Sequence, residues 1–491
     1  MNPGRGMRGY TPPMPLPELA SRLAALVGAD RVSTDPAKLR EAARDLTEIR
    51  GTPPDVIVRP AGLEHVQAVL RFANSERIPV VPVVFNTNVG GLALPSNGGI
   101  LLDMTGMNRI LEVNADDLYM VVEPGVTWGQ VKEHLDRNYP QTRFAYSLSP
   151  PDTSVLANTL MDGLLNLSLR FGTSSDWLNG VEAVLADGTV VRTGAAAWST
   201  VQWCSSAPMP DLTGLFVNLH GTTGIVTKAS IRLQHGKRLR RRYFMMGYDL
   251  RACYTTIRTL VREEICDDIG LLTWPVAKML FGEKRPRWRG PGEPLAMIYL
   301  DVSSNRQAEM DLRLSILEET LEAGRKAGHA WQGPLDVRDL VKIEPAFRKL
   351  AEFPTRLDFM LDHPGGGLSW VGTYGPTSRW DEATELAVRI MEEHAFPPFA
   401  VARPMAQGHF GVLRLIETFD RDKPAEVEAV AKLNAALVEA LLPLGFIPYK
   451  TPEWVFRAHG SKIDAGFREM LRRVRSALDP NGILNPGKWP V

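Results

Sequence analysis

The length, composition and charge of the chain already restrict what kind of protein it is. With 491 residues it exceeds what one hydrophobic core usually fills, so we expect two or three domains. A hydrophobic content of 44% and a charged content of 23% are ordinary for a globular protein and exclude a disordered chain, a coiled coil or a fibre. Lysine and arginine (56) balance aspartate and glutamate (56), so no net charge attracts nucleic acid or an anionic membrane, and we expect a small-molecule partner.

The cysteines and the N-terminus bear on the compartment. Cys204, Cys253 and Cys266 supply neither a disulfide framework nor a Cys-x-x-Cys metal spacing. The N-terminus lacks the apolar core of a signal peptide, and no stretch reaches the roughly 18 consecutive apolar residues of a membrane span. We therefore expect a cytoplasmic protein. The basic run at 237–242 is expected to be a solvated strand or linker, with a nucleic-acid patch as the alternative.

Hydrophobic periodicity predicts the elements of the first half in chain order. After a proline-rich lead we expect helices at 16–27 and 35–46. A strand at 56–58, a helix at 63–74 and a strand at 80–84 then form a strand–helix–strand unit. The further expected elements are strands at 99–102, 110–113 and 119–122, a helix at 128–135, and a hairpin of 180–185 with 190–191.

The pattern of apolar residues changes in the second half of the sequence. Between about residues 236 and 445 longer helical patterns alternate with strands, which predicts a second domain. Helices are expected at 310–327 and 381–394, and strands at 296–302 and 367–373. The chain closes with a helix at 463–478 and a tail rich in proline and glycine. The order of elements predicts an α+β protein.

The loop after the strand at 80–84 is the first candidate for chemistry. No GxxxxGK[ST], GxGxxG, HExxH or GxSxG motif occurs, so the common nucleotide-binding and hydrolytic signatures are absent. The loop ends in the pair Gly90–Gly91, where backbone N–H groups can cradle a pyrophosphate. An ordinary turn between strands is the alternative reading.

The order and spacing of several segments resemble one flavoprotein family, that of vanillyl-alcohol oxidase and para-cresol methylhydroxylase, which also includes glycolate and D-lactate dehydrogenases. The segments that carry the resemblance are 79–103, 121–126, 180–194, 211–227 and 478–484. The resemblance implies an α+β fold in which a two-part FAD-binding domain of the para-cresol methylhydroxylase type (PCMH-type) encloses an inserted α/β cap domain. The implied boundaries are 1–236 for the FAD domain with an N-terminal lead at 1–50, 237–445 for the cap, and 446–491 for the returning segment.

The resemblance also implies the residues that hold FAD. The loop over the pyrophosphate would be Asn86, Thr87, Asn88, Val89, Gly90 and Gly91. The residues that would line the flavin are Pro151, Asp152, Thr153, Ser154 and Asn158, and those that would contact FAD through the backbone are Gly221, Thr222, Gly224, Ile225 and Val226.

Features of the cap resemble the phenol-oxidising branch of the family. They are the run at 365–370, His409 ahead of 418–422, and the pair Tyr449–Lys450. The hydroxy-acid branch usually has a second histidine after its Gly-His pair; here Val412 follows Gly411 and no second histidine comes, so we expect no metal site.

The phenol chemistry gives these residue types roles. A free phenol titrates at about pH 10, so holding it as phenolate at neutral pH takes about 4 kcal/mol from donors and positive charge. Tyr449 and Lys450 would supply part of that stabilisation. The phenolate would then assist hydride loss from the para benzylic carbon to flavin N5, leaving a quinone methide. Asp152 would be the base or electrostatic partner, and His409 would belong to the same catalytic group.

The sequence departs from the family at three places. Val89 stands where the oxidase has a phenolate-binding tyrosine, and Lys450 replaces an arginine, which keeps the charge but loses the bidentate fork. The family's flavin-linking residues correspond to Gly367 and to Phe396 or Phe399, none of which can form the bond. We therefore expect noncovalent FAD.

The prediction is an FAD-dependent oxidase or dehydrogenase that takes hydride from a benzylic or allylic carbon or alcohol, most simply of a 4-hydroxyaryl compound. One alternative is a 2-hydroxy-acid dehydrogenase of the D-lactate or glycolate type, in which Lys450 or Arg403 binds the carboxylate and His409 is the base. The other is a flavin-binding subunit without turnover. The electron acceptor is expected to be oxygen, a cytochrome or a quinone, and a homodimer is in keeping with the family.

Overall fold

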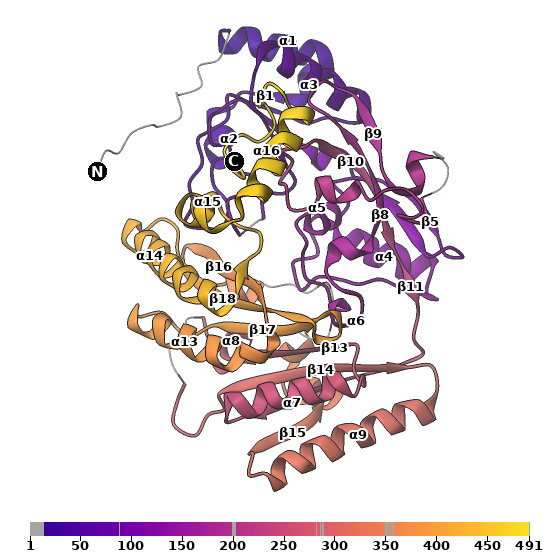
Figure 1. Ribbon diagram of the computed structural model, residues 1–491, viewed down its shortest axis with the longest axis vertical. Coiled ribbons are helices and arrows are strands. Elements are labelled where there is room, and N and C mark those ends of the chain that lie inside the picture. Colours follow the sequence, from indigo (N-terminus) through magenta and orange to yellow (C-terminus); the bar gives the residue numbers. More distant parts are fainter. Residues whose placement is uncertain are drawn as a thin grey trace.

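The two ends of the chain build one domain and the middle of the chain builds another, as the colours of Figure 1 show. The computed structural model describes residues 14–87, 89–198, 203–280, 282–284, 286, 289–348, 352, 354 and 358–490. Both domains mix helices and strands, which confirms the predicted α+β class. We refer to them as the FAD domain and the cap, the names used for the resembling family.

A small sheet with parallel strands opens the FAD domain. Its order is β1-β2-β4-β3, and β4 pairs in parallel with both β2 and β3. The strands are β1 (Val32–Ser33), β2 (Val56–Val58), β3 (Val80–Val83) and β4 (Ile100–Asp103), and the helices are α1 (Leu16–Val27), α2 (Pro36–Glu41) and α3 (Leu63–Glu76). Helix α1 buries Leu19, Leu23 and Val27 at helical spacing in the same core as the strands. The expected helix at 35–46 ends early at Glu41, and the residues after it reach the candidate site.

An antiparallel sheet completes the folded core of the FAD domain. Its order is β5-β6-β10-β8-β9, and the predicted hairpin is confirmed as the β8–β9 pair. The strands are β5 (Ile110–Asn114), β6 (Tyr119–Val122), β8 (Leu178–Val184), β9 (Val190–Arg192) and β10 (Ile225–Arg232). Helix α4 (Trp128–Asn138) begins with a reciprocal capping box between Thr127 and Gln130. Two short helices, α5 (Val155–Leu160) and α6 (Ser168–Phe171), follow, and β7 (Thr142–Arg143) pairs with β11 (Gln234–His235).

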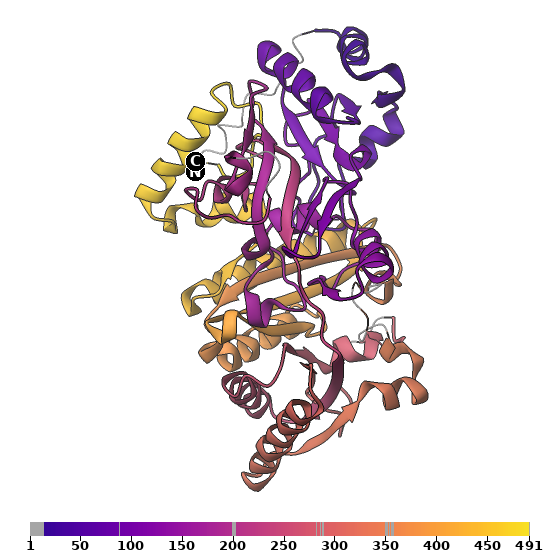
Figure 2. The same ribbon diagram turned by 90° about the vertical axis from the view of Figure 1, so that its right-hand side faces the viewer.

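The cap is an eight-stranded antiparallel sheet in the order β15-β12-β14-β13-β17-β18-β16-β19. Its strands are β12 (Leu239–Gly247), β13 (Asp268–Thr273), β14 (Ala296–Ser304), β15 (Trp331–Asp336), β16 (Gly366–Gly375), β17 (Ala400–Met405), β18 (Phe410–Asp420) and β19 (Ile447–Pro448). Its longer helices are α7 (Leu250–Arg262), α9 (Gln307–Lys326), α13 (Trp380–Glu393) and α14 (Pro424–Leu441), and its shorter ones are α8 (Trp274–Leu280), α10 (Val337–Ile343) and α12 (Asp358–Leu361). The four longer helices share one core with one face of the sheet, as Figures 1 and 2 show.

The opposite face of the cap sheet packs toward the FAD domain. Leu368 of β16 and Ile416 of β18 belong to a core cluster that also contains Val89 of the loop after β3. Side chains alternate between faces along a strand, so even-numbered residues of β18 point to this side and odd-numbered ones to the helices. The cap sheet therefore supplies one wall of whatever lies between the two domains.

Two details of the cap differ from the sequence-based expectation. The basic run at 237–242 lies largely in β12, and its last residue, Arg242, is buried against Asp301 with Nε 2.6 Å from Oδ1, so it is not a solvated linker throughout. Strand β19 still pairs with β16, so the chain leaves the cap sheet after Pro448.

The C-terminal segment lies against the FAD domain. Helices α15 (Glu453–His459) and α16 (Ala465–Leu478) lie beside it in both views (Figures 1 and 2). Leu484 bridges to Val80 of β3, and Asn485 donates to the carbonyls of Leu92 (3.1 Å) and His220 (2.7 Å). The tail thus ties together two loops of the candidate site. Among the described residues no helix has both the length and the apolarity to cross a bilayer.

Candidate active site

The loop after β3, which the sequence predicts to be a cradle for the pyrophosphate, contains several residues in the left-handed region of the backbone. Phe85 and Asn86 have φ angles of 60° and 51°, and Gly91 has 65°. The amide of Gly91 donates to Asp45 Oδ2 at 2.9 Å, and Asn86 Nδ2 donates to the carbonyl of Arg44 at 2.5 Å. Burial raises the pKa of Asp45 to about 6, although its hydrogen bonds oppose that shift. The segment that follows α2 therefore fixes the geometry of the cradle, a role that the sequence did not indicate.

A small inner cavity lies behind the cradle in the FAD domain. It has a volume of about 100 Å³ and is lined by residues of β3, β10 and their loops: Pro82, Val83, Val84, Asn86, Leu92, Ala93, Met104, Pro124, Leu156, Ala157, Leu160, Met161, Phe216, His220, Gly221, Gly224, Ile225 and Val226. A Cβ on Gly221, which has a φ of 77°, would lie 2.7 Å from Pro82 Cγ. Of the five residues expected to contact FAD through the backbone, four line this cavity: Gly221, Gly224, Ile225 and Val226. Thr222 is fully buried outside it.

A larger main cavity of about 550 Å³ lies between the FAD domain and the cap. Its lining is Leu46, Val84, Thr87, Val89, the run 147–154, Ala157, Asn158, Met161, Leu164, Leu361, Leu368, Trp370, Arg414 and Lys450. Val84, Ala157 and Met161 also line the inner cavity, so the two hollows adjoin. An elongated ligand can therefore run from the FAD domain to the cap.

Two cations face this largely apolar cavity. Arg414 enters from β18 and Lys450 from the loop that leaves the cap sheet. Arg414 stacks over the ring of Trp370, with Cζ 5.1 Å from the ring centroid. No carboxylate lies within ion-pair distance of either cation in the part of the chain that the structure describes. A guanidinium and an amine without a carboxylate partner among the described residues make this end of the cavity suited to an anionic ligand.

Lys450 is held in an unusual backbone conformation. Its φ angle of 50° is in the left-handed region, which is rare for a residue other than glycine and occurs more often at functional sites. Its Nζ lies 3.1 Å from Asn158 Oδ1. Burial, reinforced by the charge of Arg414, lowers the pKa of Lys450 to about 7. A lysine in this environment can exchange a proton near neutral pH.

Tyr449, which the sequence predicts to be catalytic, lies behind the wall of the main cavity. Tyr449 is buried outside the main cavity, where its Oη accepts a hydrogen bond of 2.6 Å from Arg414 Nε. The ring of Tyr374 stacks on the ring of Tyr449 at 4.3 Å between centroids. Tyr449 therefore orients Arg414 and does not itself line the cavity with Asp152.

The remaining expected flavin-lining residues lie together. Pro151, Asp152, Thr153, Ser154 and Asn158 all line the main cavity, and Asp152 is exposed there. The hydroxyl of Ser154 is already used, since it caps α5 and donates to the carbonyl of Pro124 at 2.6 Å.

In the cradle, Thr87 and Val89 line the main cavity, Gly90 and Gly91 complete the loop, and Asn88 lies outside the described residues.

Two residues named for acid–base or carboxylate roles are not at the cavity. His409 is exposed directly before β18 and lines none of these hollows. Arg403 is 2% exposed and donates to Asp268 Oδ1 at 2.6 Å and to the carbonyl of Leu165 at 2.8 Å. Because a buried guanidinium with these partners is an interior structural group, Arg403 cannot serve as the cation that binds the substrate.

Arg414 is the functional residue that sequence reasoning missed. It stands alone in a strand of apolar residues, with Val412 and Ile416 on the same face. The sequence does show an arginine that alternates with apolar residues on one face of a strand. It does not show which face of that strand meets the cavity. Trp370, whose ring lies under Arg414, belongs to the run at 365–370.

The hollows fit FAD. Asn86 Oδ1 and Asn158 Nδ2 are buried without a partner among the described atoms, so both sides of the elongated cavity hold a polar atom that a ligand can satisfy. The paired glycines leave no room for side chains, because a Cβ on Gly90 would lie 2.7 Å from the carbonyl oxygen of Lys450. Among the described residues no group of three or more histidine, cysteine, aspartate or glutamate side chains is placed to hold a metal.

Comparisons with known proteins match two parts of the chain to family models. Residues 54–194 match the model of the FAD binding domain, and residues 459–489 match that of the C-terminal domain of FAD linked oxidases. The chain is an FAD-linked oxidoreductase with a PCMH-type FAD-binding fold.

The individual relatives are named for two different substrate classes. Glycolate oxidase subunit GlcD of Bacillus subtilis is 25% identical over 457 residues, which are 89% of this chain and 88% of the relative. The chain spans less than half the length of the D-lactate and D-2-hydroxyglutarate dehydrogenases that it also matches. A structure of p-cresol methylhydroxylase with substrate bound superposes with a TM-score of 0.85 at 19% identity, covering 99% of this chain and 98% of the other. The 4-ethylphenol oxidase of Gulosibacter chungangensis gives 0.85 at 21% identity and 98% coverage of both chains.

Proposed function

We propose that the protein oxidises a 4-hydroxyaryl compound by removing hydride from its benzylic or allylic carbon. The observation that carries this proposal is the pair Arg414 and Lys450 at the edge of an apolar cavity also lined by Asp152. An aromatic ring suits the apolar walls, and an ionised phenol oxygen suits the two cations. The shared fold with enzymes that act on p-cresol and 4-ethylphenol supports this substrate class.

The residues of the chain would divide the work. FAD, when bound in the cradle and the two cavities, supplies the hydride acceptor. Arg414 and Lys450 stabilise the phenolate oxygen, and Tyr449 keeps the guanidinium in place through its hydrogen bond. Leu368 and Trp370 exclude water from the ring, and Asp152 holds or accepts a proton beside the reacting carbon.

The substrate class is tested by anaerobic bleaching of the flavin. We expect 4-hydroxybenzyl alcohol to reduce the flavin and 4-methoxybenzyl alcohol to leave it oxidised, because the methyl ether cannot ionise. Equal reduction by both would remove the phenolate from the mechanism. Repeating the productive reaction in air, with a cytochrome or with a soluble quinone identifies the electron acceptor.

A 2-hydroxy acid is the second candidate, favoured by one observation. Two neighbouring cations also suit the two oxygens of a carboxylate, and the relative GlcD is named for glycolate. Lys450 and Arg414 would then bind the carboxylate, in place of the Arg403 expected from the sequence. Bleaching by glycolate or D-lactate and not by the phenol would establish this candidate, and no bleaching by either would favour a flavin-binding protein without turnover.

We also propose that FAD is held without a covalent bond. Gly367 lies at the start of β16, Phe399 is fully buried in the core, and Phe396 packs against the cap core. None of these side chains can bond to a flavin. After acid precipitation we expect the yellow colour in the supernatant; colour retained in the pellet would show a covalent link and contradict the proposal.

A further inference from the structure

We propose that Lys450 accepts the phenol proton of the substrate as it binds, keeps it while the phenolate is bound, and exchanges it with solvent through a groove beside α16 once the product has left. This inference rests on the proposed phenolic substrate. It gives Lys450 a proton-transfer role beyond that of a fixed positive charge.

Lys450 lies where three hollows meet. It lines the main cavity together with Arg414 and Asp152. It also lines a side groove of about 660 Å³, whose lining is residues 214, 215 and 217–220, Tyr374, residues 447–451, Phe467, Met470, Leu471, Val474 and Trp489. A third, small hollow connects it to Glu48 and Asn434 behind β16. Lys450 thus borders both the main cavity and the side groove.

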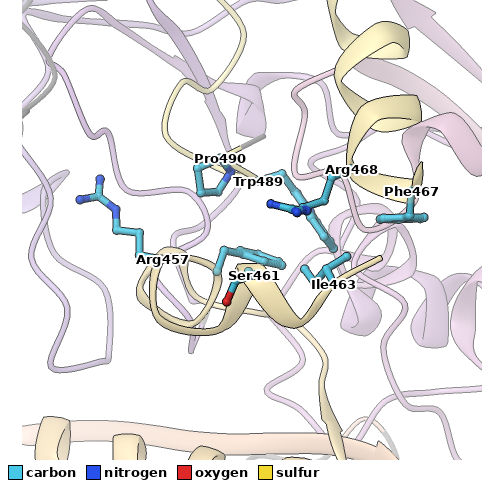
Figure 3. A pocket seen from close by; sticks show the side chains of 9 residues that line it. Arg457, Ser461, Ile463, Phe467, Arg468, Trp489 and Pro490 are labelled. Carbon is cyan, nitrogen blue, oxygen red and sulfur yellow. The ribbon is translucent and has the colours of Figure 1, made fainter. Parts of the chain in front are cut away.

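The side groove opens at the surface of the molecule. Three of its lining residues are well exposed: Ile447 (65%), Met470 (59%) and Phe467 (44%). Phe467 and Trp489 also line a neighbouring hollow of about 300 Å³ around α15 and α16, shown in Figure 3. A proton on Lys450 can therefore reach solvent without passing the bound substrate.

The surroundings of Lys450 favour a neutral amine before substrate binds. Its partner is the neutral amide of Asn158, and Arg414 places a second positive charge near it. Burial is the main cause that lowers its pKa to about 7, and the charge of Arg414 adds to it, so a large fraction is unprotonated near neutral pH. An arginine at the same position could not accept a proton in this pH range.

The transfer balances without another reactant. The phenol O–H bond breaks, an N–H bond forms on the Lys450 amine, and the products are a phenolate and an ammonium. Transfer from a phenol of pKa about 10 to an amine of pKa about 7 costs about 4 kcal/mol before the two products interact. In the cavity the phenolate gains two adjacent cations, Arg414 and the new Lys450 ammonium, which offsets that cost.

Other titratable groups near Lys450 are the competing acceptors. Tyr449 and Tyr374 have pKa values raised by burial, so both keep their protons near neutral pH. Asp152 lines the main cavity, Asp162 interacts with Lys450 electrostatically, and Glu48 lines the small hollow. If one of these carboxylates took the proton, replacing Lys450 would leave proton uptake unchanged.

Calorimetric titration of the FAD-loaded protein with 4-chlorophenol separates these cases. This ligand has no benzylic carbon, so it binds without being oxidised. Titrations in phosphate and in Tris give the number of protons released on binding. We expect about one proton released at about pH 6, where Lys450 is already charged, and almost none at about pH 8.5, where it is neutral.

The variant Lys450→Arg keeps the charge and removes the acceptor. It should release about one proton at both pH values, whereas the control Lys228→Arg, at a partly buried ion pair with Glu182 outside these cavities, should follow the wild type. Constant release of one proton by the wild type would overturn the proposal, as would wild-type behaviour of Lys450→Arg. The wild-type pH series stands even if that variant fails to fold. No binding of 4-chlorophenol, with glycolate or D-lactate bleaching the flavin, would instead overturn the phenolic substrate.

Discussion

Replacing Arg414 by glutamine is expected to lower kcat/KM for the phenolic substrate about 100- to 1000-fold. Loss of a desolvated charge partner costs roughly 2–5 kcal/mol, and about 2.7–4 kcal/mol corresponds to that change in rate. The effect should be large because Arg414 has no carboxylate partner among the described residues and lies over Trp370 in the cavity wall. The measurement is the rate of anaerobic flavin reduction as a function of substrate concentration.

The same variant has a second, independent readout. The charge of Arg414 helps to depress the pKa of Lys450, so its removal should move that pKa upward and shift the pH at which proton release falls to a higher value. Arg379→Gln, which breaks a surface pair with Glu382, is the matched control and should change neither quantity. An unaltered kcat/KM in Arg414→Gln would show that the substrate's anion binds elsewhere.

Replacing Gly90 by alanine is expected to weaken FAD binding at least about tenfold and to lower the free energy of unfolding by about 1–3 kcal/mol. The added Cβ would lie 2.7 Å from the carbonyl oxygen of Lys450 and 3.4 Å from Leu92 Cγ. The closer atom belongs to the backbone, so either the cradle or the Lys450 loop must move. Quenching of flavin fluorescence during titration of the FAD-free protein measures the first effect, and denaturant unfolding measures the second.

A control for the glycine variant comes from elsewhere in the C-terminal segment. A Cβ on Gly460 would meet no atom within 4 Å, and Gly460 has a φ of −58°. Gly460→Ala should therefore bind FAD as the wild type does. Wild-type FAD affinity in Gly90→Ala would mean that the loop after β3 does not hold the cofactor as closely as its backbone indicates.

Much of the fold could be predicted because its signals are local. The hairpin β8–β9 follows from two apolar runs around Asp187–Gly188, and α9 and α16 follow from their helical periodicity. Helix α2 was predicted too long, because its hydrophobic spacing continues beyond Glu41. The structure uses the next residues to bind the cradle through Asp45, a contact 46 residues away in sequence.

The sequence by itself determined the α+β class and the FAD-linked oxidoreductase, since these rest on consecutive residues with fixed spacing. Only the tertiary structure decided the substrate end of the site. There Arg414 and Lys450 come from β18 and the loop after β19, and the register of an eight-stranded sheet places Arg414 in the cavity and Tyr449 behind it. Side-chain alternation predicts two faces for a strand but not which one meets the other domain. Which face of the strand meets the FAD domain depends on contacts between residues far apart in the chain. The same is true of the ion pair between Arg403 and Asp268.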